Sequence, residues 1–316
     1  MSKFPDIVGL GSGRSGTTYI YYYLEQHPDV SIPVQKELNF FSSRKDLSEK
    51  DLDVYRQQLN FEEGKKSFEI SPSYLWPEAL GNSVTIKDVA ANIARLMPAT
   101  VPLFGILRSP AARAYSQFLF DIKSKKITRG CFYEELEKGR NSEQAFVLCN
   151  YLSDNIREVL DTLRKYHIEF FVNETDIGPQ AHALRRVSEL LGIELMKFEH
   201  GERINTTRGL KIYAPEKEAV TVNLTGTDRT PDVAAPSVAV TVQPGEVFFR
   251  TGWHAWNLHL SGLEKHELSD YRSLADFIGS PPTKEQEAEI NSLYYRDEIN
   301  QLQDLLKIDL SHWTSN

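Results

Sequence analysis

The sequence predicts an α/β fold of three layers with a central parallel sheet, and three observations lead to it. Apolar strands and helices alternate along the first half of the chain and beyond. The stretch at 7–24 passes from an apolar strand through a glycine-rich turn into a helix. The segment at 101–107 contains no charged residue, as expected of a strand covered on both faces. Alternating strands and helices form parallel sheets, because each crossover helix returns the chain to the same edge.

Proline and glycine bound the first of these elements. A helix that begins at Thr17 and Thr18 is expected to end near Gln26, because Pro28 disfavours helix in the residue before it. Pro110 fits the first turn of the helix that follows the strand at 101–107. Further strands are predicted at 30–32, 68–70 and 170–172, and further helices within 42–64, 84–96, 149–166, 183–191 and 285–307.

The character of the sequence changes between 210 and 280. Apolar and polar residues alternate at 219–224, 237–242 and 246–251, with turn-forming residues between them. Strands of this kind pair in antiparallel sheets and do not extend a parallel one. We therefore expect one α/β domain made of residues 1–209 and 281–316, with a small antiparallel β-rich insertion at 210–280.

The composition excludes several classes of protein. The chain has 316 residues and a formal net charge of −8 at pH 7, which argues against a general binder of nucleic acid or membrane surfaces. Cys131 and Cys149 are too few for a disulfide framework and are not spaced for zinc; two free thiols are favoured over one bridge.

The same sequence predicts where the protein resides. No run approaches the ~20 apolar residues of a membrane span. The first strand follows the N-terminus too closely to leave room for a signal peptide. We therefore expect a cytoplasmic protein, and the sequence indicates no particular oligomeric state.

The glycine-rich turn has the chemistry of an anion-binding site. Gly11, Gly13 and Gly16 allow backbone turns that bring several N–H groups against one ligand. Arg14 adds positive charge. The helix that starts at Thr17 directs unpaired N–H groups and the positive end of its dipole toward the same place. This stretch predicts a nucleotide site.

The turn departs from the best-known phosphate loop at one position. In G-x-x-x-x-G-K-[ST] a lysine follows the second glycine, whereas here Thr17 follows Gly16. A kinase needs that lysine on its phosphates and an acidic residue for magnesium at the end of a neighbouring strand. The strand at 101–107 is followed instead by Arg108. The sequence favours a P-loop-like fold for a ligand with separated phosphates and no metal; a small-molecule or nucleoside kinase is the alternative.

Three further groups of residues are candidates for the same site. Lys36 and Glu37 precede an apolar and aromatic stretch and indicate either a site edge or a surface charge pair. Arg108 and Ser116 are eight positions apart, and both can reach one phosphate if the helix doubles back along the sheet edge. The segment at 203–209, RINTTRG, is either a second ligand loop or an ordinary connection.

Five segments, in order, resemble a known family. They are GRSGTTYIYYYLEQHPDV at 13–30, KELNFF at 36–41, EISPSYL at 69–75, LRSPAARAYSQF at 107–118 and LYYRDEINQLQDLLKIDLSHW at 293–313. The chain resembles the sulfotransferases that use 3′-phosphoadenosine 5′-phosphosulfate (PAPS), especially the heparan-sulfate-type and bacterial carbohydrate branch. The resemblance covers most of the chain outside 210–280.

The resemblance implies roles for the matched residues. The loop Gly13–Thr18 is similar to the loop that holds the 5′-phosphosulfate, with Arg14 where the family usually has lysine. Arg108 and Ser116 resemble the pair that binds the 3′-phosphate. Glu37 stands where the heparan-type enzymes have their catalytic base. The implied catalytic residues are Glu37, Arg14 and Lys36; the implied cofactor-binding residues are Gly13, Arg14, Ser15, Gly16, Thr17, Thr18, Arg108, Ser116, Arg208 and Gly209.

The implied reaction is direct in-line transfer of a sulfuryl group from PAPS to an acceptor hydroxyl, without a metal and with adenosine 3′,5′-bisphosphate (PAP) as product. A carbohydrate or glycoconjugate acceptor is expected from the branch and from the aromatic-rich insertion at 210–280, a candidate acceptor-side wall or lid. A lipid, polyketide or phenolic acceptor stays open, as does a histidine base. A non-catalytic carbohydrate-binding or scaffold protein is the remaining alternative.

Overall fold

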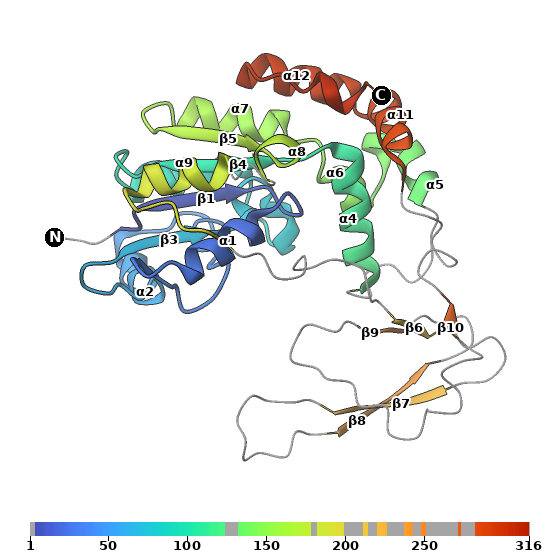
Figure 1. Ribbon diagram of the computed structural model, residues 1–316, viewed down its shortest axis with the longest axis horizontal. Coiled ribbons are helices and arrows are strands. Elements are labelled where there is room, and N and C mark those ends of the chain that lie inside the picture. The colour runs from blue at the N-terminus through green and yellow to red at the C-terminus, as the bar shows by residue number, and fades with distance from the viewer. Residues whose placement is uncertain are drawn as a thin grey trace. The chain divides into compact units, whose positions relative to one another are not determined.

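The computed structural model describes residues 4–123, 132–177, 182–198, 211–213, 220–225, 237–242, 248–250, 271–272 and 282–315 (Figure 1). The chain divides into two compact units. The first comprises Met1–Gln117, Gly139–His200 and Thr283–Asn316, and the second comprises Phe118–Lys138 and Gly201–Pro282.

The first unit is built on a five-stranded sheet in the order β2-β3-β1-β4-β5. The strands are β1 (Ile7–Gly11), β2 (Val30–Ser31), β3 (Lys66–Ile70), β4 (Leu103–Leu107) and β5 (Ile168–Val172). Every neighbouring pair is parallel. The predicted central parallel sheet is confirmed, and β1 lies in its middle.

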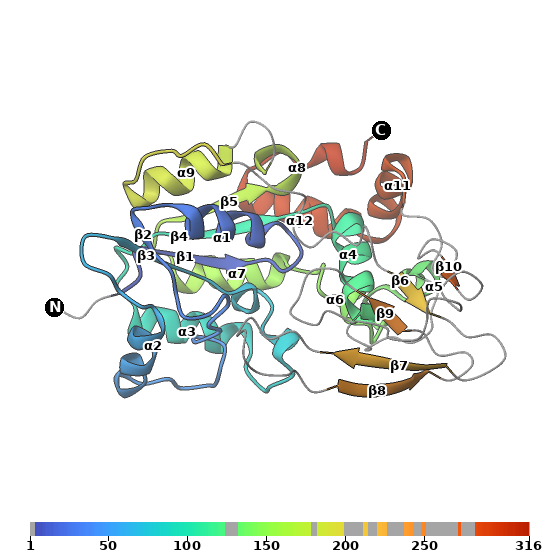
Figure 2. The same cartoon turned by 60° about the horizontal axis from the view of Figure 1, so that its bottom comes forward.

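Helices cover both faces of this sheet and complete the three predicted layers. On one face lie α1 (Thr17–Gln26) and α9 (His182–Leu191), and on the other lie α3 (Ile86–Leu96) and α7 (Ser153–Thr162) (Figure 2). One core cluster joins strand residues such as Phe68 and Phe104 to α1 and α9. Other helices of the chain are α2 (Leu52–Gln58), α4 (Pro110–Lys123), α5 (Phe132–Glu137), α6 (Ala145–Leu148) and α8 (Asn173–Asp176).

The helix ends follow from the local sequence. Helix α1 ends at Gln26, as the proline at 28 predicts. The Thr85 hydroxyl accepts from the Asp88 amide, and the Asp88 carboxylate accepts from the Thr85 amide, so a capping box opens α3. Pro110 is the first residue of α4. These boundaries are therefore set locally.

The C-terminal helical segment departs from its sequence pattern. The pattern over 285–307 shows no break, whereas the structure has two helices, α11 (Lys284–Tyr294) and α12 (Arg296–Leu306), separated at Tyr295. The Tyr295 ring is buried and packs against Tyr151 with centroids 5.5 Å apart. The Glu298 carboxylate accepts from the amides of residues 152 and 153 at 2.7 and 2.6 Å, at the start of α7. These contacts with distant residues set the direction of α12.

The second unit contains the predicted antiparallel strands. Strands β7 (Val220–Thr225) and β8 (Ser237–Val242) form an antiparallel pair. Strand β6 (Lys211–Tyr213) lies between β9 (Phe248–Arg250) and β10 (Tyr271–Arg272), antiparallel to both. None of the described helices has both the length and the apolar character that a membrane span requires.

Candidate active site

The predicted anion-binding loop lies at the carboxyl edge of the sheet. Residues 12–16 connect β1 to α1. From β1 the chain adds β3 on one side and later β4 on the other, so the strand order reverses at β1. In open α/β sheets, ligands bind in the crevice outside the carboxyl ends of the strands at such a point. The loop therefore occupies the position where this topology places a ligand site.

Side chains from later elements hold consecutive carbonyl groups of this loop. Arg113 Nε donates to Gly13 O at 2.7 Å, Arg108 Nη1 to Arg14 O at 2.9 Å, and Asn173 Nδ2 to Ser15 O at 2.8 Å. In a trans peptide the N–H points away from the C=O that precedes it. The next amide N–H groups, of residues 14, 15 and 16, are thus directed away from these three side chains, as in a backbone nest for an anion.

The start of the loop is fastened to the neighbouring strand. Ser12 donates from both its backbone N–H and its hydroxyl to the carbonyl oxygen of Ile106 in β4, at 3.0 and 2.9 Å. The hydroxyls of Ser12 and Ser15 lie 2.7 Å apart and are buried. The loop is therefore held from β4 before any ligand binds.

Gly16 is required where the loop enters α1. Its φ of 107° lies outside the range of ordinary L-residues. A Cβ there would lie 2.7 Å from Asn173 Nδ2 and 2.8 Å from Ile177 Cδ1. Among the described residues no side chain caps the first turn of α1. The N–H groups of that turn, with Thr17 and Thr18, therefore face the end of the loop as a helix N-terminus does in phosphate sites.

The structure brings Arg14, Arg108 and Ser116 together. Arg14 has a left-handed φ of 63°, and its Nε donates to Ser116 Oγ in α4 at 3.1 Å. Arg108, which follows β4, contacts the Arg14 carbonyl as described above. Residues from the first loop, from the end of β4 and from α4 thus meet at one place. The bond to Ser116 places this part of α4 beside the loop.

Lys36 and Glu37 form an ion pair on a constrained turn. Lys36 Nζ lies 2.5 Å from Glu37 Oε1, and the two side chains are 28% and 37% exposed. Glu37 and Asn39 both have left-handed φ values, 67° and 54°. Such a conformation costs about 1–3 kcal/mol for a residue other than glycine, and it persists only where the surroundings enforce it. The turn is therefore held by contacts outside itself.

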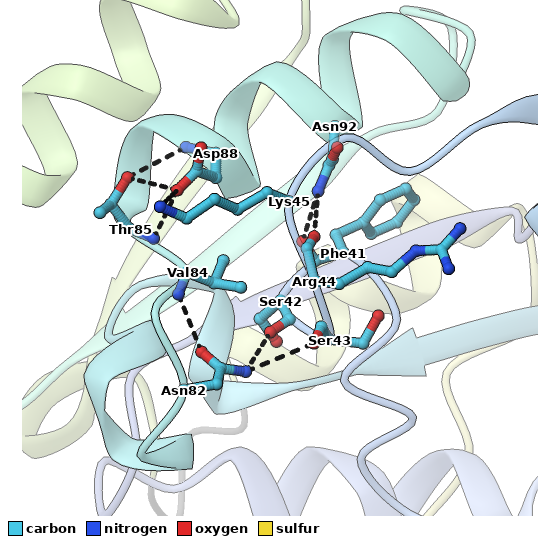
Figure 3. Close-up of polar contacts among 10 residues, drawn as sticks. All are labelled: Phe41, Ser42, Ser43, Arg44, Lys45, Asn82, Val84, Thr85, Asp88 and Asn92. Carbon is cyan, nitrogen blue, oxygen red and sulfur yellow. Dashed lines mark hydrogen bonds and ion pairs between the residues drawn. The ribbon is translucent and has the colours of Figure 1, made fainter.

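The segment that follows this turn is anchored to α3 and to the loop before it. Asn92 of α3 donates to the carbonyls of Phe41 and Arg44, both at 3.0 Å, and Asn82 donates to that of Ser42 at 3.0 Å (Figure 3). Asn92 is buried. These bonds fix the chain on the C-terminal side of the Lys36–Glu37 pair.

Glu69 is a buried carboxylate beside this turn. It is fully buried at the end of β3 and accepts hydrogen bonds from the hydroxyls of Ser71, Tyr74 and Tyr55, the last at 3.1 Å. Burial raises the pKa of Glu69 to about 7 against the lowering effect of the hydroxyls, and the negative charge of Glu37 adds to the rise. Glu69 is thus a titratable group in electrostatic contact with the candidate base.

Some predicted residues lie outside the described part of the chain. They are Arg208 and Gly209, which stay a prediction, and Cys131. Cys149 is buried, and its thiol donates to the Phe146 carbonyl at 3.7 Å.

The sequence interpretation missed Arg113, Asn173 and Glu69 as parts of the site. Arg113 lies between Arg108 and Ser116 in the sequence, where no pattern indicates a contact with the loop. Asn173 directly follows a predicted strand, and Glu69 lies within one. Because the carboxyl ends of parallel strands share one edge, a search of strand ends would have found Asn173 and Glu69.

Comparison with known proteins gives one relative in sequence. No protein-family model matches the chain. Over 120 residues, 38% of this chain, it is 28% identical to the membrane-associated sulfotransferase kil1 of Dictyostelium discoideum. The match spans 23% of kil1, so the chain covers less than a quarter of that relative's length.

Solved structures are similar over a larger part of the chain. The crystal structure of a sulfotransferase from Alicyclobacillus acidocaldarius matches with a TM-score of 0.55 and 16% identity, over 99% of this chain and 100% of that one. The sulfotransferase domain from the curacin biosynthetic pathway matches 66% of this chain and 82% of its own, with 14% identity and a TM-score of 0.42.

The comparisons show which fold the chain has. The chain shares its three-layer fold with the Alicyclobacillus acidocaldarius structure, and the predicted anion-binding loop lies between β1 and α1. In sequence the chain is similar to kil1 over the 120 matched residues. The fold implied by the resemblance of the five segments is confirmed.

The buried carboxyl gives a testable pH dependence of stability. Burial raises the pKa of Glu69 to about 7 in the folded protein, against about 4.3 in an unfolded chain. The contribution of Glu69 to the free energy of unfolding is therefore complete below about pH 4.3. It is lost as the pH rises through about 7. Between pH 5 and 7 we expect the wild type to lose about 2–3 kcal/mol of unfolding free energy relative to Glu69→Gln, at about 1.4 kcal/mol per pH unit. Urea unfolding at each pH measures this.

The exposed Glu289 of α11 provides the matched control. Glu289→Gln is expected to leave the pH dependence of the wild type unchanged. Parallel curves for the wild type and Glu69→Gln between pH 5 and 8 would contradict the prediction.

Proposed function

We propose that this chain is a sulfotransferase that moves a sulfuryl group from PAPS to an acceptor hydroxyl by direct in-line transfer. The observation that carries the proposal is that Arg14 contacts both Ser116 and Arg108 at the loop, through its side chain and its carbonyl respectively. The loop carbonyls that are held in this way point away from the proposed ligand side. The residue types suit a donor with phosphates at two separate positions. The fold and the relative in sequence support the same activity.

The loop supplies donors for the phosphate that carries the sulfuryl group. PAPS brings the activated sulfuryl group and, after transfer, leaves as PAP. Negative charge builds on the 5′-phosphate as the bond to sulfur breaks, so fixed N–H donors and a cation there stabilise the transition state more than the ground state. In our proposal the amides of residues 14–16, the Thr17 hydroxyl and the Arg14 guanidinium serve this purpose. The bond to Ser116 orients that guanidinium.

Arg108 and Ser116 are the proposed contacts of the 3′-phosphate. Guanidinium groups match phosphate oxygens with paired N–H donors, and a serine hydroxyl adds one more. Because Arg108 also donates to the Arg14 carbonyl, the two phosphate positions are linked through one side chain. Occupation of one position therefore favours the geometry of the other.

Glu37 is the proposed base, with Lys36 beside it. The acceptor hydroxyl loses its proton to the Glu37 carboxylate as its oxygen attacks sulfur, and the sulfuryl–phosphate bond breaks with its electron pair on the 5′-phosphate oxygen. General base catalysis of this kind contributes about 10²–10⁴-fold. The ion pair with Lys36 at 2.5 Å orients the carboxylate in our proposal.

A kinase with the same fold is the second candidate, and the site residues argue against it. Thr17 occupies the place of the lysine that binds β- and γ-phosphates. Glu69 is the acidic residue of β3. Its carboxylate accepts hydrogen bonds from three hydroxyl groups, so its oxygens already have protein partners. Neither feature suits a magnesium–triphosphate complex.

The donor site is tested by nucleotide binding. PAP is expected to raise the melting temperature of the wild type, and ATP with magnesium is not. Arg108→Ala should lower PAP affinity about tenfold or more, since a hydrogen bond to a charged group is worth about 1.5–3 kcal/mol. Isothermal titration calorimetry measures the PAP affinity of each variant. Arg185→Ala, on the exposed surface of α9, removes the same charge and is the matched control. Stabilisation by ATP with magnesium alone would favour the kinase.

The base is tested by turnover. Glu37→Gln keeps the size of the side chain but removes the proton acceptor, so PAPS turnover is expected to fall about 10²–10⁴-fold. PAP affinity should stay within about twofold of the wild type, because Glu37 is not a phosphate ligand in our assignment. A variant that turns over at the wild-type rate would show that another group takes the proton.

The acceptor class and the insertion complete the proposal. We propose a carbohydrate or glycoconjugate acceptor, with residues 210–280 as the acceptor-side wall or lid. A chain that lacks 210–280 is then expected to bind PAP normally and to transfer nothing in a radiolabelled-PAPS screen across glycans, lipids and phenols. Loss of PAP binding in the same chain would point to a structural role for the insertion.

A further inference from the structure

The turn that carries Glu37 depends on hydrogen bonds that come from the end of β3. Asn39 N–H donates to Ser71 Oγ at 2.8 Å, and Asn39 Nδ2 donates to the Glu37 carbonyl at 2.9 Å. The Asn39 side-chain oxygen accepts from Ser73 Oγ at 2.6 Å. Asn39 therefore links the backbone of Glu37 to two serines of the segment that follows β3.

Ser71 is itself fixed on both sides. Its backbone N–H donates to the Gly9 carbonyl in β1 at 3.0 Å, which continues the parallel sheet by one residue. Its hydroxyl donates to the Glu69 carboxylate. A hydroxyl has one proton. Because the Ser71 hydroxyl donates its hydrogen bond to Glu69, its oxygen can only accept a bond from Asn39. The Asn39 N–H is a donor, so the two groups match.

We propose that Glu69 and Ser71 are positioning residues for Glu37: through the chain Glu69–Ser71–Asn39 they hold the turn at 36–39 in its left-handed conformation and thereby set the place of the Glu37 carboxylate. This inference rests on the proposed role of Glu37 as the base. The left-handed φ values of Glu37 and Asn39 are the two features of the turn that demand an outside constraint. Neither Glu69 nor Ser71 contacts substrate in this assignment.

The structure offers a matched pair of variants. Ser71→Ala removes one hydroxyl from Glu69 and the acceptor of the Asn39 amide. Tyr55→Phe also removes one hydroxyl from Glu69, at a site that is equally buried, and leaves Asn39 untouched. The two variants lose the same kind of bond to the carboxylate, so a difference between them reports the link to Asn39.

The test combines an amide-exchange measurement with PAPS turnover, followed as PAP release. Ser71→Ala is expected to speed hydrogen exchange at the Asn39 amide at least about tenfold, since that N–H loses its acceptor, and to lower turnover about tenfold with unchanged PAP affinity. Tyr55→Phe should change each quantity less than about threefold. Equal effects of the two variants, or unchanged exchange in Ser71→Ala, would overturn the proposal.

A double-mutant cycle separates this inference from the proposed function. If Ser71 acts through Glu37, Ser71→Ala slows turnover in the wild type but adds nothing in a Glu37→Gln background. Additive losses overturn the positioning role and leave Glu37 as base. Full turnover in Glu37→Gln overturns the base itself, while the exchange measurement still judges the constraint on the turn.

A second variant guards against misfolding of Ser71→Ala. Asn39→Gly keeps a left-handed φ without cost and deletes the side-chain bonds to Glu37 and Ser73. It is expected to reduce turnover about tenfold with unchanged PAP affinity and unchanged melting temperature. Wild-type turnover in a folded Asn39→Gly protein would overturn the proposal.

Discussion

The candidate site depends on one constraint, the outward fixing of consecutive loop carbonyls. Arg113, Arg108 and Asn173 each hold one of them. Peptide geometry then turns the following N–H groups to the opposite side, which is the arrangement that the proposed anion-binding site requires. The buried Arg113 guanidinium also donates to the Cys149 carbonyl, which ties the loop to the segment before α7. The loop conformation is therefore a property of the whole first unit.

The parallel sheet explains how these side chains meet. The loop follows β1, Arg108 follows β4, and Asn173 follows β5, and the carboxyl ends of parallel strands lie at one edge. On the other side of β1, the end of β3 supplies Glu69 and Ser71, which support the turn of Glu37. The proposed donor site and the proposed base thus use opposite neighbours of the same central strand.

Much of the fold and part of the site could be predicted because the signals are local. The glycine spacing and the absent lysine at Thr17 defined the loop, and Pro28 and Pro110 marked helix ends that the structure confirms. The break at Tyr295 could not be predicted, since it depends on a ring buried against Tyr151 and not on helix propensity. Arg113 was missed for a similar reason: an arginine inside a helix has no sequence signal for a carbonyl a hundred positions away.

The sequence by itself determined the class of fold, and it predicted an anion-binding loop and the candidates Arg14, Glu37, Arg108 and Ser116, because periodicity, glycine spacing and segment resemblance are properties of neighbouring residues. Only the tertiary structure decided that Arg14 turns to Ser116, that Arg108 holds the loop carbonyl, and that a buried carboxylate stands behind the turn of Glu37. Those facts arise from strand order and burial, which join residues that lie far apart in the chain.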